Sequence, residues 1–228
     1  MSAKKTILTG STDGRLIKVV ATATAGTTIH TAEASNKDEV HLYAYNNHTA
    51  DVKLTIEFGG VTVPDDLIEE TIPFKNGLHL VLPGLVISGS LVVKAFASTA
   101  NVIYIAGFVN EIGGTDQTLS KEFFSGSTNG RGVEATATSS VGTTIHTAHA
   151  SQLDEIYMWG VNHTTSNEEI TIEWGATGAD NQIKQTLTGE NGLELMVPGL
   201  VLTNSGTVKI FAATASSTHF GYVNRYTT

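Results

Sequence analysis

The chain has 228 residues, of which 40% are hydrophobic and 15% charged, and this composition excludes an intrinsically disordered chain. The formal net charge of −9 leaves no excess of lysine and arginine, so we expect neither nucleic acid nor an anionic membrane as a partner. Cysteine is absent, which excludes disulfides and thiolate sites and is compatible with assembly in a reducing cytoplasm.

The first residues of the chain carry two lysines but no apolar run long enough for a signal peptide. No later segment reaches the length of a membrane span. We therefore expect a soluble, unprocessed chain. Residues 1–9 are predicted to form an N-terminal arm that is free over residues 1–6 and packs through Ile7 and Leu8.

The segment Gly-Thr-Thr-Ile-His-Thr-Ala occurs twice, at residues 26–32 and 142–148. Further segments recur around it, and the spacing between matching positions drifts only from 116 residues (26 to 142) to 114 residues (107 to 221). Such self-similarity over about a hundred residues indicates two copies of one domain. We expect domain 1 at residues 10–112, a linker at 113–125 and domain 2 at 126–228.

Each copy consists of short β-branched segments separated by Gly, Asn, Asp or Pro about every ten residues, which is typical of an all-β sandwich. Eight antiparallel strands in a domain of this size predict a jelly-roll-like sandwich, with the strand order left open. Asn76-Gly77 predicts a tight turn. A strand follows this turn, and Pro83-Gly84 is expected to end that strand. In the first copy the strands are expected at residues 16–24, 27–32, 39–45, 52–58, 67–72, 78–82, 91–97 and 102–109.

Two of these strands carry apolar side chains on both faces, although a sandwich strand has one inner face. In the third strand Tyr43 and Tyr45 alternate with the core positions, as Trp159 does in the second copy. In the sixth strand Val81, or Met196 in the second copy, alternates with leucines. Two interpretations stay open: another domain or subunit covers these side chains, or they are ordinary isolated exposed residues.

The last strand differs between the copies, because Val-Ile-Tyr-Ile at residues 102–105 corresponds to Ser-Ser-Thr-His at residues 216–219. If burial follows composition, copy one uses this strand in a dry contact and copy two leaves it in water. The linker begins as a flexible tether and ends in two phenylalanines expected to dock on a domain surface. The candidate interface comprises Tyr43, Tyr45, Val81, Val102, Ile103, Tyr104, Ile105, Phe123, Phe124, Trp159 and Met196.

The titratable residues that occur in both copies do not form a reactive constellation. Asp38 and Glu39 are adjacent in a strand, so they point to opposite faces and cannot act on one bond. His30 has threonine neighbours rather than metal ligands and is expected to be a hydrogen-bonded strand histidine. Glu57 and Glu173 are assigned to a solvated sheet face. We expect no catalytic, cofactor-binding or metal-binding residues, no cofactor and no enzymatic activity.

The recurring segments resemble a known family. Gly-Ser-Thr-(Asn/Asp)-Gly-Arg, Gly-Thr-Thr-Ile-His-Thr-Ala, Asp-Glu-(Val/Ile), Leu-Thr-Ile-Glu-Phe-Gly-Gly, Val-Leu-Pro-Gly-Leu-Val and Gly-(Phe/Tyr)-Val-Asn are similar to segments of small β-sandwich virion proteins of tailed bacteriophages. The resemblance covers both copies and implies a non-enzymatic component of the virion, assembled in the host cytoplasm. It implies a capsid decoration or cement protein bound outside the major capsid lattice.

Three functions follow as hypotheses. The first is a virion structural protein that forms a homo-oligomer, expected to be a trimer, and clamps the major capsid protein or other virion proteins through complementary surfaces and edge-strand pairing. The second keeps the virion and places the chain in the neck, tail or fibre. The third is a carbohydrate-binding sandwich in which Tyr43, Tyr45 and Trp159 stack on sugar rings.

Overall fold

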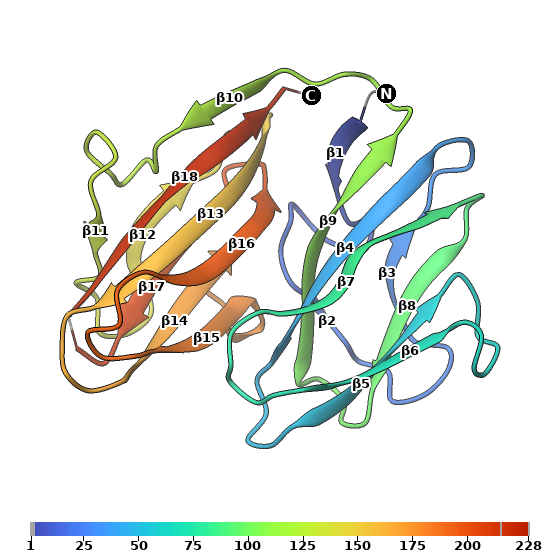
Figure 1. The fold of residues 1–228 in the computed structure, drawn as a ribbon, viewed down its shortest axis with the longest axis horizontal. Coiled ribbons are helices and arrows are strands. Elements are labelled where there is room, and N and C mark those ends of the chain that lie inside the picture. The colour runs from blue at the N-terminus through green and yellow to red at the C-terminus, as the bar shows by residue number, and fades with distance from the viewer. Residues whose placement is uncertain (1–2, 215, 228) are drawn as a thin grey trace. The chain divides into compact units, whose positions relative to one another are not determined.

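The computed structural model describes residues 3–214 and 216–227, and within them the chain is all-β (Figure 1). These residues form eighteen strands and a single three-residue 3-10 helix, η1, at Ala179–Asn181. None of their helical segments is long and apolar enough to cross a membrane. The chain divides into two compact units, unit 1 at Met1–Gln117 and unit 2 at Thr118–Thr228. The all-β class predicted from the sequence is confirmed.

Unit 1 contains two antiparallel sheets. The five-stranded sheet has the order β1-β9-β4-β7, with the short strand β2 also paired to β9, and the four-stranded sheet has the order β3-β8-β5-β6. The strands of unit 1 are β1 Ala3–Ile7, β2 Ile17–Lys18, β3 Thr27–Thr31, β4 Lys37–Asn46, β5 Val52–Phe58, β6 Leu67–Ile72, β7 His79–Ser88, β8 Val92–Ala97 and β9 Ile103–Ile112.

Unit 2 repeats this arrangement strand for strand. Its five-stranded sheet has the order β10-β18-β13-β16, with β11 also paired to β18, and its four-stranded sheet has the order β12-β17-β14-β15. The strands of unit 2 are β10 Leu119–Glu122, β11 Val133–Glu134, β12 Thr143–Thr147, β13 Leu153–Asn162, β14 Glu168–Gly175, β15 Gln182–Leu187, β16 Glu194–Leu202, β17 Thr207–Ala212 and β18 Ser217–Tyr226.

The core of unit 1 follows from the alternation of side chains along its strands. Val40 and Leu42 on β4 and Leu54 and Ile56 on β5 are fully buried, while their sequence neighbours point to the opposite faces. Residues of both sheets belong to one hydrophobic cluster, so the two sheets share a single core. The same positions are buried in unit 2, where Trp174 on β14 is the largest fully buried side chain.

Both chain segments expected to be free of the domains are partly strand. Ala3–Ile7, placed in the N-terminal arm, forms β1 and pairs along its full length with β9. Leu119–Glu122, placed in the linker, forms β10 and pairs in the same way with β18. Gln117 also bonds to the backbone of unit 1, because its side-chain oxygen accepts the Lys5 N–H at 2.8 Å. The expected free arm is wrong for residues 3–6, and the linker is paired at Leu119–Glu122, since an edge strand needs a partner strand and no apolar pattern of its own.

Pro83-Gly84 does not end its strand as expected. β7 continues through it, and the pairing with β4 shifts register between Val40 and His41 and again between Leu42 and Tyr43. Proline is tolerated because β7 is the last strand of its sheet and the bulge removes the need for a ladder hydrogen bond. The first predicted strand, residues 16–24, is in contrast reduced to the two-residue β2.

Candidate functional site

The recurring Gly-Thr-Thr-Ile-His-Thr-Ala segment places a buried histidine against a buried aspartate. In unit 1 His30 Nε2 lies 2.9 Å from Asp38 Oδ2, and in unit 2 His146 Nε2 lies 2.9 Å from Asp154 Oδ2. All four side chains are almost inaccessible to solvent. This pair joins β3 to the start of β4, and β12 to the start of β13, so the histidine is a structural tie, as the sequence predicted for His30.

The backbone fixes the protonation of both histidines. The N–H of Thr9 donates to His30 Nδ1 at 3.3 Å, and the N–H of Ser125 donates to His146 Nδ1 at 3.1 Å. A nitrogen that accepts a hydrogen bond carries no proton, so the proton of the neutral ring is on Nε2 and is donated to the aspartate. The ring is thereby locked between two partners and is not available as a metal ligand or a general base.

The aspartate has one more partner in unit 2 than in unit 1. Burial alone would raise the pKa of Asp154, but hydrogen bonds from His146 and Arg225 lower it to about 2. Arg225 donates to both carboxylate oxygens, at 2.7 and 3.0 Å. In unit 1 the position of Arg225 is held by Glu111, and Asp38 Oδ1 has no hydrogen-bond partner among the described residues.

Aromatic side chains gather on the other face of each five-stranded sheet. In unit 2 the ring of Tyr157 stacks on that of Tyr222 at 5.2 Å between centroids, and Trp159 lies 6.1 Å from Tyr222. Lys121 Nζ lies 3.7 Å from the centre of the Tyr222 ring. In unit 1 Lys5 lies at the same distance from Phe108, which stacks on His41.

A glutamate lies beside each aromatic group. Glu39 Oε1 is 2.6 Å from His41 Nε2, and this hydrogen bond lowers the pKa of Glu39. In unit 2 Glu155 accepts hydrogen bonds from Asn224 and from Tyr226, and burial raises the pKa of Tyr226. Glu39 and Asp38 therefore lie on opposite faces of β4, as their adjacency predicted. Among the described residues no group of three or more His, Asp or Glu side chains could hold a metal ion.

Most of the side chains expected at an interface are buried. The core of unit 1 contains Val81, Ile103 and Ile105, with Val102 packed against it. Tyr45 and Tyr104, which lie 6.4 Å apart, are also buried, as are Phe124 and Met196. Tyr43 and Trp159 are half-buried, and Phe123 is 62% exposed. The structure therefore does not bring the eleven residues together as one exposed surface, because the alternation that selected them does not say which face of a strand is the inner one.

The predicted contrast between the last strands of the two copies is wrong. Ser217 and His219 on β18 take the core positions of Ile103 and Ile105 on β9 and are fully buried. Ser217 Oγ and His219 Nε2 form a hydrogen bond of 3.2 Å, and His219 Nδ1 has no hydrogen-bond partner among the described residues. Burial lowers the pKa of His219 to about 4. The position of a residue in the sheet, and not its polarity, therefore decides whether it is buried in this strand.

Glu57 and Glu173, expected on a solvated face, are also buried. In unit 2 the Ser140 hydroxyl donates to Glu173 Oε1 at 2.5 Å and the Gly142 N–H donates to Oε2 at 2.9 Å. In unit 1 the Gly26 N–H donates to Glu57 Oε2, but Glu57 Oε1 has no partner among the described residues. The first glycine of each recurring segment donates its N–H to the glutamate, a non-local contact that alternation along the strand cannot reveal.

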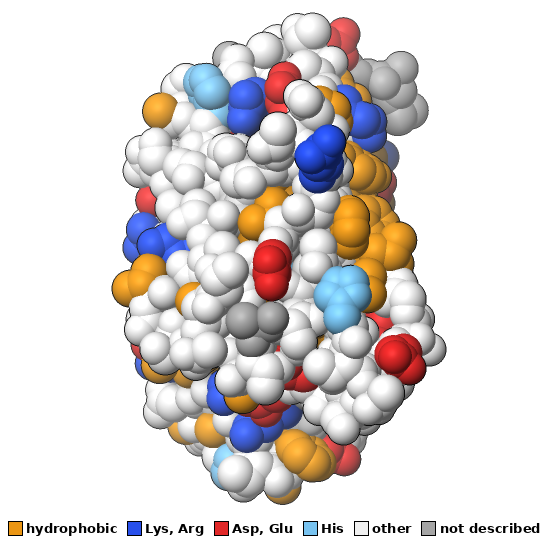
Figure 2. All heavy atoms as spheres, turned by 90° about the vertical axis from the view of Figure 1, so that its left-hand side faces the viewer, with side chains coloured by type: hydrophobic (Ala, Val, Ile, Leu, Met, Phe, Trp, Pro, Cys, Tyr) orange, Lys and Arg blue, Asp and Glu red, His pale blue; other side chains and the backbone are white. Residues whose placement is uncertain are grey.

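The sequence did not predict the exposed apolar side chains on the edge strand β7. Leu80, Leu85 and Val86 on β7 are 46%, 38% and 51% exposed, and β7 is the outermost strand of its sheet. In unit 2 the residues matching the last two, Leu200 and Val201, are 1% and 0% exposed. Figure 2 shows a different face, on which hydrophobic side chains also gather in small groups among scattered charges of both signs. The Pro-Gly bulge, which resets alternation, was the available signal.

Comparison with known proteins adds little. No family model matches the chain, and no curated protein matches it. One solved structure, the N-terminal CBM22-1–CBM22-2 tandem domain of Paenibacillus barcinonensis Xyn10C, aligns over 100% of this chain and 91% of that chain with 12% identity. Its TM-score is 0.23, a value too low to support an argument about fold or function.

Proposed function

We propose that the chain is a non-enzymatic structural protein of a virus particle, a decoration or cement protein that binds the outside of the capsid lattice and stabilises it. The observation that carries the proposal is the exposed apolar edge of β7. Monomeric proteins rarely expose contiguous apolar side chains, so such side chains on the outermost strand of a sheet indicate a contact with another chain. In a protein whose role is adhesion to a lattice, the same edge is the contact.

The strand order supports a jelly-roll fold for each unit. With β1 and β2 taken as one interrupted first strand, the first, eighth, third and sixth strands form one sheet, and the second, seventh, fourth and fifth form the other. This is the order of the eight-stranded jelly roll, a double-sheet fold common in viral capsid proteins and lectins. The resemblance of the recurring segments to phage virion proteins points in the same direction.

Multivalency explains how a modest edge can suffice. A decorated capsid offers many equivalent sites, and an oligomer that engages several at once gains avidity without any new contact. A trimer of this two-unit chain presents six related units, which suits a threefold or quasi-sixfold position of a lattice. The proposal therefore includes self-association of the chain, expected as a trimer.

The test is binding to capsids assembled from the major capsid protein of the encoding genome. We expect the purified chain to sediment with these capsids. The double variant Leu85→Lys, Val86→Lys should bind at least about tenfold more weakly, because the two lysine charges would be desolvated in the apolar contact without partners. The matched control is Val63→Lys, which places one lysine at a loop position that is 74% exposed in the same unit.

Three outcomes decide the matter. Binding that is lost in the β7 variant and kept in the control supports the proposal. A stable monomer in light scattering that ignores capsids overturns it. The third outcome is measured by quantitative mass spectrometry of particles. A few copies of the chain per particle, instead of numbers comparable with the capsid protein, would support a place in the neck, tail or fibre.

A further inference from the structure

The outer face of the five-stranded sheet of unit 2 carries four aromatic side chains in two neighbouring rows. Trp159 on β13 is directly paired with Phe220 on β18, and Tyr157 is paired with Tyr222. The two rows are two residues apart along each strand, which places them about 7 Å from each other. Phe220 is 36% exposed, and the other three side chains are half-buried. We call these four side chains the aromatic platform.

Two glycines let rings of the aromatic platform lie along the sheet. A side chain at Gly199 would meet the tip of the Tyr157 ring at 2.7 Å, and a side chain at Gly132 would meet the Phe220 ring at the same distance. Each ring therefore fills the space above the next strand. Where rings of the platform contact one another, their planes differ by 20°, 24° and 37°. Rings in nearly parallel planes along a sheet form a flat apolar floor.

Polar side chains border the platform beyond Phe220. Thr218 is the next outward residue of β18, and its hydroxyl oxygen lies 2.8 Å from Nε2 of the exposed His163. Glu134 on β11 is also exposed and is directly paired with Thr218. A hydroxyl, an imidazole and a carboxylate together donate and accept hydrogen bonds. The flat apolar floor thus ends at a group of side chains that suits a ligand rich in hydroxyls.

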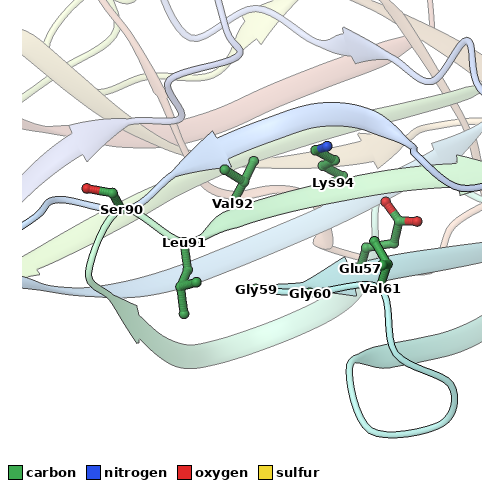
Figure 3. Close-up of a pocket in the computed structure, with 8 residues that line it drawn as sticks. All are labelled: Glu57, Gly59, Gly60, Val61, Ser90, Leu91, Val92 and Lys94. Atoms are coloured by element: carbon green, nitrogen blue, oxygen red, sulfur yellow. The ribbon is translucent and has the colours of Figure 1, made fainter.

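Unit 1 is built differently at the same positions. Ala106 and Phe108 on β9 correspond to the two platform residues of β18 and are only 2% and 7% exposed. On β4 the corresponding residues are His41 and Tyr43. The small open pocket of unit 1 beside β5 and β8 is lined by aliphatic, polar and glycine residues (Figure 3). The exposed aromatic floor is therefore a property of unit 2.

We propose that the aromatic platform binds an uncharged oligosaccharide. The C–H groups on the faces of sugar rings pack against aromatic rings, and the hydroxyl groups at their edges bond to Thr218, His163 and Glu134. The charged side chains at the border are Lys121, Glu134 and Glu155, so an anionic ligand would meet more carboxylate than ammonium. A protein partner would cover about 20–30 residues, far more than this platform offers.

The two rows of the platform set the expected size of the ligand. One sugar ring covers one row, and a second ring is needed to cover both, because the rows are about 7 Å apart. Affinity should therefore rise from a monosaccharide to a disaccharide, with a dissociation constant on the order of 1 mM for the latter. The site belongs to unit 2 and does not rest on the capsid proposal, which concerns β7 of unit 1.

The experiment is a two-dimensional NMR titration of the full chain. The probes are mono-, di- and trisaccharides of glucose, mannose and N-acetylglucosamine, with digalacturonate as the acidic sugar. The chain has two tryptophans, and the indole N–H of each gives its own signal. We expect a saturable shift of the Trp159 indole with at least one uncharged oligosaccharide. The fully buried Trp174 and the amides of Gly59 and Gly60, in the pocket of Figure 3, are internal references that should not move.

Two variants test the platform itself. Phe220→Ala introduces the residue that unit 1 has at this position, Ala106, so we expect it to fold and to bind about tenfold more weakly. Trp159→Ala should weaken binding at least as much, and the Trp174 indole signal reports whether unit 2 is still folded. The matched control is Tyr43→Ala, which removes the ring at the corresponding position of unit 1 and should leave binding unchanged.

Four results would overturn the proposal. The first is equal binding by the unchanged chain and by Phe220→Ala. The second is tighter binding of digalacturonate than of every uncharged sugar. The third is the absence of a saturable shift up to 50-fold above the expected dissociation constant, about 50 mM. The fourth is a response of the Trp159 indole to capsids and to none of the sugars, which would assign the platform to a protein contact.

Discussion

Units 1 and 2 share their strand order and their buried His–Asp tie, yet they differ at the partners of their buried carboxylates. Asp154 is held by Arg225 and Glu173 by Ser140, whereas the matching oxygens of Asp38 and Glu57 have no partner among the described residues. The outermost strands differ as well, since Leu85 and Val86 on β7 are exposed while the matching Leu200 and Val201 on β16 are buried. The two units therefore share a scaffold and differ in how their buried carboxylates are satisfied.

The largest expected difference between the units comes from removing the tie. His30→Ala leaves Asp38 with one backbone N–H, from Glu33, whereas His146→Ala leaves Asp154 with Arg225 as well. Depriving a buried carboxylate of a hydrogen-bond donor costs about 3 kcal/mol, so unit 1 should lose about that much and unit 2 clearly less. Hydrogen exchange read by mass spectrometry measures the two units separately in the full chain. Equal losses in both units would show that Arg225 contributes nothing.

The second difference is a pH dependence of stability between about pH 4 and 6.5, which His219 should give to unit 2. His219 has its pKa lowered to about 4 in the fold from 6.5 in the unfolded chain, so the unfolded state binds more protons between these values. The stability that the neutral ring contributes is complete above pH 6.5 and is lost as pH falls towards 4, up to about 3 kcal/mol. Both tryptophans, Trp159 and Trp174, lie in unit 2, so their fluorescence during urea unfolding follows it.

The control for this pH effect is already present in the chain. Ile105 takes the place of His219 in unit 1, so His219→Ile copies the sister position and should flatten the pH profile of unit 2 between pH 4 and 6.5. A profile that keeps its slope in this variant would assign the titration to another group. The lowered pKa of Asp154 acts in a different window, below about pH 4, and cannot imitate it.

A third, smaller effect tests the missing arginine directly. Glu111 stands opposite Asp38 where Arg225 stands opposite Asp154, so Glu111→Arg gives the unpaired Asp38 Oδ1 a donor. A charge-assisted hydrogen bond should exceed the loss of the contacts of Glu111 with Asn36 and Lys4, and unit 1 should gain about 1 kcal/mol. The measurement is again hydrogen exchange by unit, and a destabilised unit 1 would contradict it.

The parts of this fold that were predictable are those with a local signal. Residues 52–58 and 67–72 were predicted as strands and are β5 and β6, because alternation and turn residues mark them in the sequence. The all-β class follows from the same signals. β1 could not be found this way, since Ala3–Ile7 has no apolar alternation and becomes a strand only by pairing with β9, more than a hundred residues away.

The candidate sites were harder to predict because they depend on which face of each strand packs into the core. Ile103 and Ile105 were selected as surface residues and lie in the core, while Leu80, Leu85 and Val86 were not selected and are exposed. Alternation gives two faces without saying which is the inner one, and the bulge at Pro83-Gly84 exchanges them within β7. Glu57 was assigned to water because the loop that buries it is remote in sequence.

The smallest predicted effect concerns the lysines over the aromatic rings, and it tests whether β1 and β10 are equivalent. Lys5 over Phe108 and Lys121 over Tyr222 have the same geometry, 3.7 Å from nitrogen to ring centre. Lys5→Met and Lys121→Met keep the aliphatic stem and remove the charge, so each should cost about 0.5–1 kcal/mol. The loss should appear first as faster exchange of the β1 or β10 amides, because these short edge strands have few other contacts. A loss confined to one unit would mean that the two edge strands, alike in pairing, are held by different forces.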